Sequence, residues 1–180
     1  MVEKLLDLGA DSNVANGRSG CVIHLYTFSN ETHFTDIFRT PLHIAICVGD
    51  LDIFRLLLSR GADPNFTSGD SETALAAAAR YQQATMLKEL LDHGADPNLQ
   101  EATAVVSAAQ YGYIEGMVML MNHGADIHAQ EGIPGKALHV AARSTQINMV
   151  KLLLDKGVDV NSFGGEYGYV RTNNAVYSLM

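Results

Sequence analysis

The stretch Thr40-Pro41-Leu42-His43-Ile44-Ala45, which runs on to Gly61-Ala62-Asp63-Pro64-Asn65, decides the fold because the chain repeats it. Further copies begin at Thr73, Thr103 and Lys136, and in every copy a glycine stands 21 positions after the first residue. These glycines are Gly61, Gly94, Gly124 and Gly157. The steps between them are 33, 30 and 33 residues. A constant period in this range is typical of a stack of similar supersecondary units.

This period and the motif Thr-Pro-Leu-His-Ile-Ala at 40–45 resemble the ankyrin-repeat family, whose units recur about every 33 residues. The resemblance extends over residues 1–161. It implies an all-α solenoid of stacked helix-turn-helix units joined by finger loops. It also implies binding to other proteins. After the array, Gly164-Gly165-Glu166-Tyr167-Gly168 resembles the opening of a finger in arrays of filamentous fungi.

The alignment of the copies predicts how the chain is organised. We expect a half repeat and four repeats, in the ranges 1–13, 14–65, 66–98, 99–128 and 129–161. Both ends are incomplete. The half repeat matches only the end of a second helix, which gives a poor outer face, so we expect either fraying there or a chain that is cut from a longer protein. Residues 162–180 begin a further repeat but lose the pattern at Tyr169, and we expect a loosely packed tail.

Residues 21–39 interrupt the first full repeat and share nothing with its pattern. Gly9 and Thr40 are 31 residues apart, whereas the matching distance is 12 in two later repeats, so the excess is 19 residues. Two interpretations are open. The segment is either a loop inserted at a finger tip, which repeat arrays tolerate, or a translated intron. The second interpretation arises because residues 35–39 can be encoded by a branch-point-like sequence and a pyrimidine-rich acceptor.

Each repeat is expected to contain two short helices of different composition. First helices should begin at Pro41, Ala74, Ala104 and Ala137. A threonine precedes three of them and can cap the helix, whereas Lys136 cannot, so the fourth should have a weaker start. First helices carry small residues that permit close approach. Second helices repeat large apolar residues on one face, and only stacking buries that face. These residues include Leu57, Leu90, Leu120 and Leu153.

Three positions depart from the pattern in ways that predict strain or loose packing. Gln82 and Thr145 stand between the two helices of their repeats, where other repeats have Gly49 and Gly112. A left-handed backbone at these two residues would introduce about 1 kcal/mol of strain each. Gly116 stands where the other repeats supply a large apolar side chain, so we expect the third repeat to be the loosest.

The totals describe an ordinary globular protein and exclude several classes. Of 180 residues, 47% are hydrophobic and 18% are charged, with a formal net charge of −8. This charge repels a phosphate backbone, so we expect no binding to nucleic acid. We find no signal peptide and no apolar run that could cross a membrane, so we expect a cytoplasmic or nuclear protein. We also expect a monomer. Cys21 and Cys47 are not spaced as metal ligands.

Seven histidines raise the question of a metal or catalytic site. His43 and His139 lie in the repeat motif, where the resemblance implies a structural hydrogen bond from one turn to the next. His93 and His123 precede closing glycines, where a polar or cationic side chain suits a helix C-terminus. The others are His24, His33 and His128, and no ligand spacing connects them. We therefore expect no metal and no cofactor.

Patterns for catalysis or phosphate binding are also absent from the sequence. It contains neither Gly-x-x-x-x-Gly-Lys-Ser/Thr nor Gly-x-Gly-x-x-Gly, and no nucleophile stands in a recognisable elbow. Asp70, Glu72, Glu101 and Glu131 fall in or near the fingers, where a solvated rim explains them. We therefore expect no catalytic residues and no enzyme activity.

Binding residues are expected at the two positions before the turn between the helices of each unit. The resemblance implies that these positions and the fingers form the concave face. The eight residues, which we call the ridge, are Cys47, Val48, Arg80, Tyr81, Gln110, Tyr111, Arg143 and Ser144. Tyrosine and arginine often dominate binding energy. Tyr81 and Tyr111 belong to consecutive units and should be neighbouring anchors, and the arginines hint at an acidic partner, although ordinary surface residues would give the same composition.

The sequence thus predicts a non-catalytic scaffold that binds a protein partner through its concave groove and finger loops. Two alternatives are open. In one, the array is the sensor or adaptor portion of a larger multidomain signalling ATPase or ubiquitin-ligase system. In the other, the chain is a decayed or mis-spliced gene product, which the incomplete ends, residues 21–39 and the two lost glycines would fit.

Overall fold

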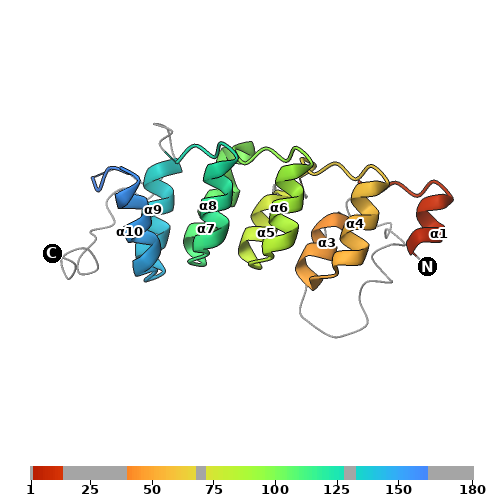
Figure 1. The fold of residues 1–180 in the computed structure, drawn as a ribbon, viewed down its shortest axis with the longest axis horizontal. Coiled ribbons are helices and arrows are strands. Elements are labelled where there is room, and N and C mark those ends of the chain that lie inside the picture. Colours follow the sequence, from red (N-terminus) through yellow and green to blue (C-terminus); the bar gives the residue numbers. More distant parts are fainter. Residues whose placement is uncertain (1, 14–39, 68–71, 128–132, 162–180) are drawn as a thin grey trace.

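In the computed structural model, helical hairpins lie one beside the next and form an elongated stack (Figure 1). The structure describes residues 2–13, 40–67, 72–127 and 133–161. Within these ranges the chain forms nine helices and no strand. They are α1 (Val2–Asp7), α3 (Pro41–Val48), α4 (Leu51–Ser59), α5 (Ala74–Arg80), α6 (Ala84–Asp92), α7 (Leu99–Gln110), α8 (Ile114–Asn122), α9 (Ile133–Arg143) and α10 (Ile147–Asp155). This architecture confirms the predicted all-α solenoid.

Each hairpin pairs a first helix with a second helix, and the pairs are α3 with α4, α5 with α6, α7 with α8, and α9 with α10. The first helices pack side by side in the order α3, α5, α7 and α9, and α6, α8 and α10 form a second row. At one end, α1 lies beside α4, and the loops that leave the second helices run along one edge of the stack (Figure 1). No helix in the described ranges combines the length and the apolar character needed to cross a bilayer.

One continuous apolar core runs through the stack. The first helices contribute small side chains, and the fully buried ones include Ala45, Ala77, Ala108 and Ala141. The second helices contribute large ones, and the fully buried leucines include Leu57, Leu90, Leu120 and Leu153. Burying one leucine stabilises the fold by roughly 1.5–3 kcal/mol relative to exposing it. Stacking therefore contributes far more than the helix propensity of these short segments.

Two of the predicted threonine caps are confirmed. Thr40 Oγ1 accepts a hydrogen bond from the backbone N–H of His43 at 3.4 Å. Thr73 Oγ1 accepts one from the backbone N–H of Ala76 at 3.0 Å. Each cap satisfies a donor that the first turn of a helix leaves free, and α3 and α5 begin at the predicted residues.

The third unit differs from the prediction because α7 begins at Leu99 and not at Ala104. Thr103 lies inside this helix and does not cap it, and its hydroxyl oxygen lies 3.4 Å from that of Thr73. The physical reason lies in the four residues from Leu99 to Ala102. Leucine, glutamine, glutamate and alanine all favour helix, so a segment that forms a finger elsewhere joins α7 here, although Gln100 interrupts the regular helix with a left-handed φ of 52°.

The start of α9 was also predicted too late, because this helix begins at Ile133 and not at Ala137. Pro134 occupies the second position, and proline is tolerated in a first turn because its missing N–H would have no partner there. Lys136 is therefore an interior residue of the helix, and the expected weaker start of the fourth unit stays a prediction.

The left-handed backbone predicted between the helices is confirmed at both unusual positions. Gln82 has φ 54° and Thr145 has φ 57°, close to φ 65° at Gly112. Side chains with a Cβ are disfavoured in this region. The two turns thus keep the geometry of the repeat although they lost the residue that suits it.

The space beside Gly116 is filled, and the prediction that the third repeat is the loosest stays a prediction. Gly116 is buried, and a Cβ placed on it would collide with the ring of Tyr113. Tyr113, only 7% exposed, lies one turn earlier and fills the volume that a larger side chain occupies in other units. The glycine therefore makes room for a ring, and the two residues exchange volume within one unit.

Several predictions fall outside the described residues. They concern the insertion 21–39, the tail 162–180, Cys21, His24, His33, His128, Asp70 and Glu131. Both interpretations of the insertion and the expected loose tail stay predictions.

Candidate functional site

The ridge residues lie at the C-terminal ends of the four first helices. Cys47 and Val48 end α3, while Arg80, Gln110 and Arg143 end α5, α7 and α9. Tyr81, Tyr111 and Ser144 each follow directly after a helix. Since the first helices stand side by side (Figure 1), the eight residues form one row of four pairs.

Exposure varies along this row. The exposed members are Val48, Arg80, Tyr111 and Arg143, and the half-buried ones are Cys47, Tyr81, Gln110 and Ser144. None of the eight is acidic. The ridge therefore offers apolar contact area, hydrogen-bonding groups and positive charge, although the chain as a whole is negative.

Arg80 and Tyr81 hold each other in place. The guanidinium carbon of Arg80 lies 5.7 Å from the ring centroid of Tyr81, within the range of a cation–π contact. On its other side, Nη1 of Arg80 lies 3.5 Å from Oε1 of Glu72. Arg80 thus already has a carboxylate partner within its own unit and also contacts the Tyr81 ring.

A hydrogen bond connects the Tyr81 turn to the next unit. The side-chain amide of Gln82 donates from Nε2 to the backbone carbonyl of Tyr111 at 3.4 Å. This contact spans two consecutive hairpins and places Tyr81 and Tyr111 at neighbouring points of the row.

The predicted site omitted a finger residue. Phe66 follows Asn65 in the first described finger and is 40% exposed, which is unusual for a large aromatic side chain. An aromatic residue directly after a turn asparagine was a visible signal for it. The ion pair from Glu72 to Arg80 carried no such signal, because the two residues are eight positions apart.

His43 has the structural role that was predicted. Its Nε2 lies 2.9 Å from the backbone carbonyl of Glu72, which can only accept, so Nε2 donates. Its Nδ1 therefore accepts from the hydroxyl of Thr40 at 2.7 Å. The buried ring joins its own helix start to the next unit. His139 is half-buried in α9, and its predicted hydrogen bond stays a prediction.

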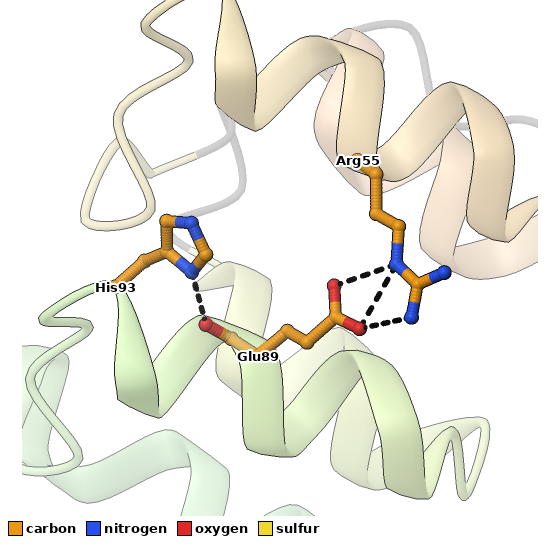
Figure 2. A network of polar contacts seen from close by, with 3 residues as sticks. All are labelled: Arg55, Glu89 and His93. Atoms are coloured by element: carbon orange, nitrogen blue, oxygen red, sulfur yellow. Dashed lines mark hydrogen bonds and ion pairs between the residues drawn. The ribbon is translucent and has the colours of Figure 1, made fainter.

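His93 and His123 lie at helix C-termini, as predicted. Nδ1 of His93 donates to the carbonyl of Glu89 at 2.7 Å (Figure 2). Nδ1 of His123 donates in the same way to the carbonyl of Met119 at 2.9 Å. Each of these carbonyls also accepts the backbone N–H of the same histidine, so the imidazole adds a second hydrogen bond at the helix end, which explains these histidines without a ligand.

Two described groups outside the ridge have shifted pKa values. Burial raises the pKa of Tyr113, and the charge of Glu115 adds to this effect. The hydrogen bond from Arg55 lowers the pKa of Glu89. Neither group belongs to the ridge, and in the described ranges no cluster of three histidine, cysteine or acidic side chains could hold a metal ion.

Comparison with known proteins gives the same repeat pattern. Residues 1–101, 42–131 and 101–164 match the family described as ankyrin repeats in three copies. Human B-cell lymphoma 3 protein is 32% identical over 129 residues, which are 72% of this chain and 23% of that protein.

Two further relatives match shorter stretches. The human ankyrin repeat and MYND domain-containing protein 1 is 48% identical over 67 residues, 34% of this chain and 7% of the relative. Palmitoyltransferase AKR1 of Lachancea kluyveri is 40% identical over 71 residues, 38% of this chain and 10% of the relative. The chain spans less than a quarter of the length of the curated relatives it matches.

Proposed function

The chain belongs to the ankyrin-repeat family, and from this premise we propose that it is a non-catalytic scaffold that binds a protein partner across the ridge and the fingers. Ankyrin repeats generally mediate protein–protein interaction, and the family is typically non-catalytic. The observation that carries the proposal is the continuous row of helix ends with Tyr81 and Tyr111 at neighbouring points. Rings of this kind supply large contact area with little loss of conformational freedom.

The charges of the ridge favour a partner segment with acidic residues. Arg143 is exposed at the end of α9, whereas Arg80 is paired with Glu72. Arg80 must exchange the carboxylate of Glu72 for that of a partner, which lowers its net gain, whereas no ion pair joins Arg143 to another described residue. We therefore assign the reading of an acidic group mainly to Arg143 and the apolar contacts to Tyr81 and Tyr111.

The remaining parts of the proposal follow from composition. A net charge of −8 disfavours nucleic acid as a partner. We propose a monomer that works in the cytoplasm or the nucleus.

A second candidate function is the sensor or adaptor portion of a larger signalling ATPase or ubiquitin-ligase system. The observation that favours it is that the relatives are much longer proteins, of which the chain matches only a minor share. The coding sequence around this chain separates the two candidates, since a nucleotide-binding domain in the same reading frame would favour the sensor role. A third candidate, a decayed product, predicts a broad and early melting transition.

The test of the ridge starts with identification of a partner by pull-down and mass spectrometry. Tyr81→Ala combined with Tyr111→Ala should then weaken binding at least about 30-fold, because each anchor contributes roughly 1–2 kcal/mol or more. Val118→Ala is the matched control, because Val118 is an exposed apolar residue on the second-helix row. Unchanged affinity in a double variant that melts like the wild type would exclude the ridge as the main binding surface.

A further inference from the structure

The hairpin of α9 and α10 exposes two large apolar side chains where other hairpins bury theirs. Ile147 is 51% exposed and Val160 is 48% exposed. In the preceding unit, the residues at the same repeat positions are Ile114, which packs against the core, and Ile127, which is 4% exposed. Inside the stack, the next unit covers these positions. This end of the stack therefore has the apolar character of a unit interface.

A ladder of asparagines joins three of the fingers to the unit that follows each of them. Asn13, Asn65 and Asn98 each accept, through Oδ1, the backbone N–H of the next finger's aspartate at 2.8 Å. Asn65 and Asn98 also donate to the carbonyl of the next closing glycine at 3.1 and 3.0 Å. In these three fingers the backbone N–H of the asparagine also donates to the side chain of the aspartate two residues earlier. Asn161 occupies the same position in the last described finger, and its backbone N–H donates to Asp159 Oδ1 at 2.9 Å.

One ion pair between two neighbouring second helices provides what we call the first charge rule. The guanidinium of Arg55 on α4 makes a forked contact to the carboxylate of Glu89 on α6, with its shortest distance at 2.6 Å (Figure 2). Lys151 occupies on α10 the position that Arg55 has on α4. It is exposed, and no ion pair joins it to another described residue.

A second charge rule applies one turn later. An acidic residue near the end of one helix pairs with the basic residue that precedes the next closing glycine. The pairs are Asp7 with Arg60 at 2.6 Å and Asp92 with His123 at 3.8 Å. Asp155 has the same position on α10, is exposed, and makes no ion pair within the described part of the chain.

We propose that this end of the stack is a docking face for a helix-turn-helix unit of another repeat protein. The second helix of that unit carries a carboxylate opposite Lys151 and a basic side chain opposite Asp155. Its closing glycine and finger aspartate meet the amide of Asn161. The face consists of Ile147, Lys151, Asp155, Val160 and Asn161, and it is separate from the ridge.

A second copy of this chain does not have that chemistry. If α1 of a second copy docked here, the repeat register would place Lys4 opposite Lys151 and Leu8 opposite Asp155. The first pair repels, and the second leaves the carboxylate without a cation. The hairpin of α5 and α6 does have the required chemistry. In the repeat register its Glu89 would face Lys151 and its His93 would face Asp155.

The test inserts a second copy of residues 66–98 between Asn161 and Ser162 of the full chain, so that the probe is present at high effective concentration. The inserted unit should fold with the array in one transition and raise the Tm by about 5 °C, since repeat stability includes a nearest-neighbour term. Melting of the insert as a separate, lower transition would overturn the proposal.

Charge reversal then tests the stated chemistry. Without the insert, Lys151→Glu should leave the Tm unchanged. With the insert, it should lower the Tm by about 2 °C, the scale of one surface ion pair. Glu89→Lys in the inserted copy should restore this loss. An equal effect of Lys151→Glu with and without the insert would contradict the charge rule, even if a given variant folds poorly.

Two other occupants give different results in the unmodified chain. Self-association in sedimentation that Val160→Asp abolishes would assign the face to a second copy and overturn the proposal. Increased hydrogen exchange of α10 after Phe163→Ser with Tyr169→Ser would assign it to residues 162–180 and overturn it as well. We expect a monomer and unchanged exchange.

Discussion

The interface between the α3–α4 and α5–α6 hairpins and the interface between the α7–α8 and α9–α10 hairpins bury the same kinds of apolar residue but differ in polar contacts. The first is crossed by His43, by the ion pair of Arg55 with Glu89, and by Asn65. In the second, Val118 takes the position of Arg55. The difference teaches that the repeat geometry does not require an ion pair at this position, because the hairpins stack in the same way although Val118 replaces Arg55.

The largest expected effect tests the shared apolar part. Leu90→Ala and Leu153→Ala should each lower the free energy of unfolding by roughly 2–5 kcal/mol, because both leucines are fully buried and a cavity remains. Urea denaturation measures this. Val118→Ala, at an exposed site, is the control and should stay within about 0.5 kcal/mol of the wild type. A loss below about 1 kcal/mol for Leu153→Ala would contradict equal apolar stacking at the two interfaces.

The next effect breaks the polar contacts of the first interface. His43→Ala removes both ring hydrogen bonds and leaves the buried Thr40 hydroxyl and the Glu72 carbonyl with one partner fewer. We expect a loss of about 1–3 kcal/mol, measured by chemical denaturation. Ala76 stands at the same repeat position in the next unit, so alanine fits the helix itself. No loss would mean that the histidine bridge adds nothing to this interface.

A smaller expected effect is an increase in stability at the turn between α9 and α10. Thr145→Gly should raise the free energy of unfolding by about 1 kcal/mol, because glycine adopts the positive φ at this turn without a Cβ clash. The Tm should rise by about 3 °C. Ser144→Gly, one residue earlier, is the control and should not stabilise. A lower Tm for Thr145→Gly would show that the turn is not strained.

The smallest effect is a pH dependence at the first interface. The hydrogen bond from Arg55 lowers the pKa of Glu89 below its ordinary value of 4.5, so the pair stabilises the folded state above that pH. This contribution is lost as the pH falls through the lowered pKa of the folded state, because the protonated carboxyl no longer carries charge. The unfolding free energy of Arg55→Gln should therefore differ from that of the wild type at pH 7 and converge with it in acid.

Lys151→Gln is the matched control for this experiment. Lys151 has the same repeat position as Arg55 but forms no ion pair with a described residue. It should show no difference from the wild type that depends on pH in this range. A constant offset for Arg55→Gln between pH 2.5 and pH 7 would remove the ion pair as the cause.

The fold could be predicted from the sequence because each repeat has the same pattern. Small residues lie on the first helix, large apolar residues lie on the second helix, and the turn between them has a left-handed backbone. Gln82 and Thr145 show the strength of this context, since both adopt the glycine geometry without being glycine. The sequence was less informative where two neighbours compensate. Gly116 indicated loose packing only as long as the ring of Tyr113 was assumed to point elsewhere, and side-chain direction is not a property of composition.

The ridge could be located by position along the repeat but not described in chemical detail. Its eight residues share helix ends, which spacing alone predicts. The pairing of Arg80 with Glu72, and hence the different availability of Arg80 and Arg143, depends on side-chain rotamers along α5. Helix starts failed for a related reason, because Leu99 continues a helix from local propensity although the repeat pattern places a finger there.

The asparagine ladder described above bears on how such a gene changes length. Asn65 and Asn98 make the same two forward bonds, although the units that they reach are of different length. Loss of the 33 codons for residues 66–98 by unequal crossing-over would leave Asn65 facing Gly124 and Asp126, with both bonds available. Recombination between copies therefore yields a shorter protein in which neighbouring repeats still form these hydrogen bonds. Selection can then change the number of repeats without a compensating mutation at the new interface.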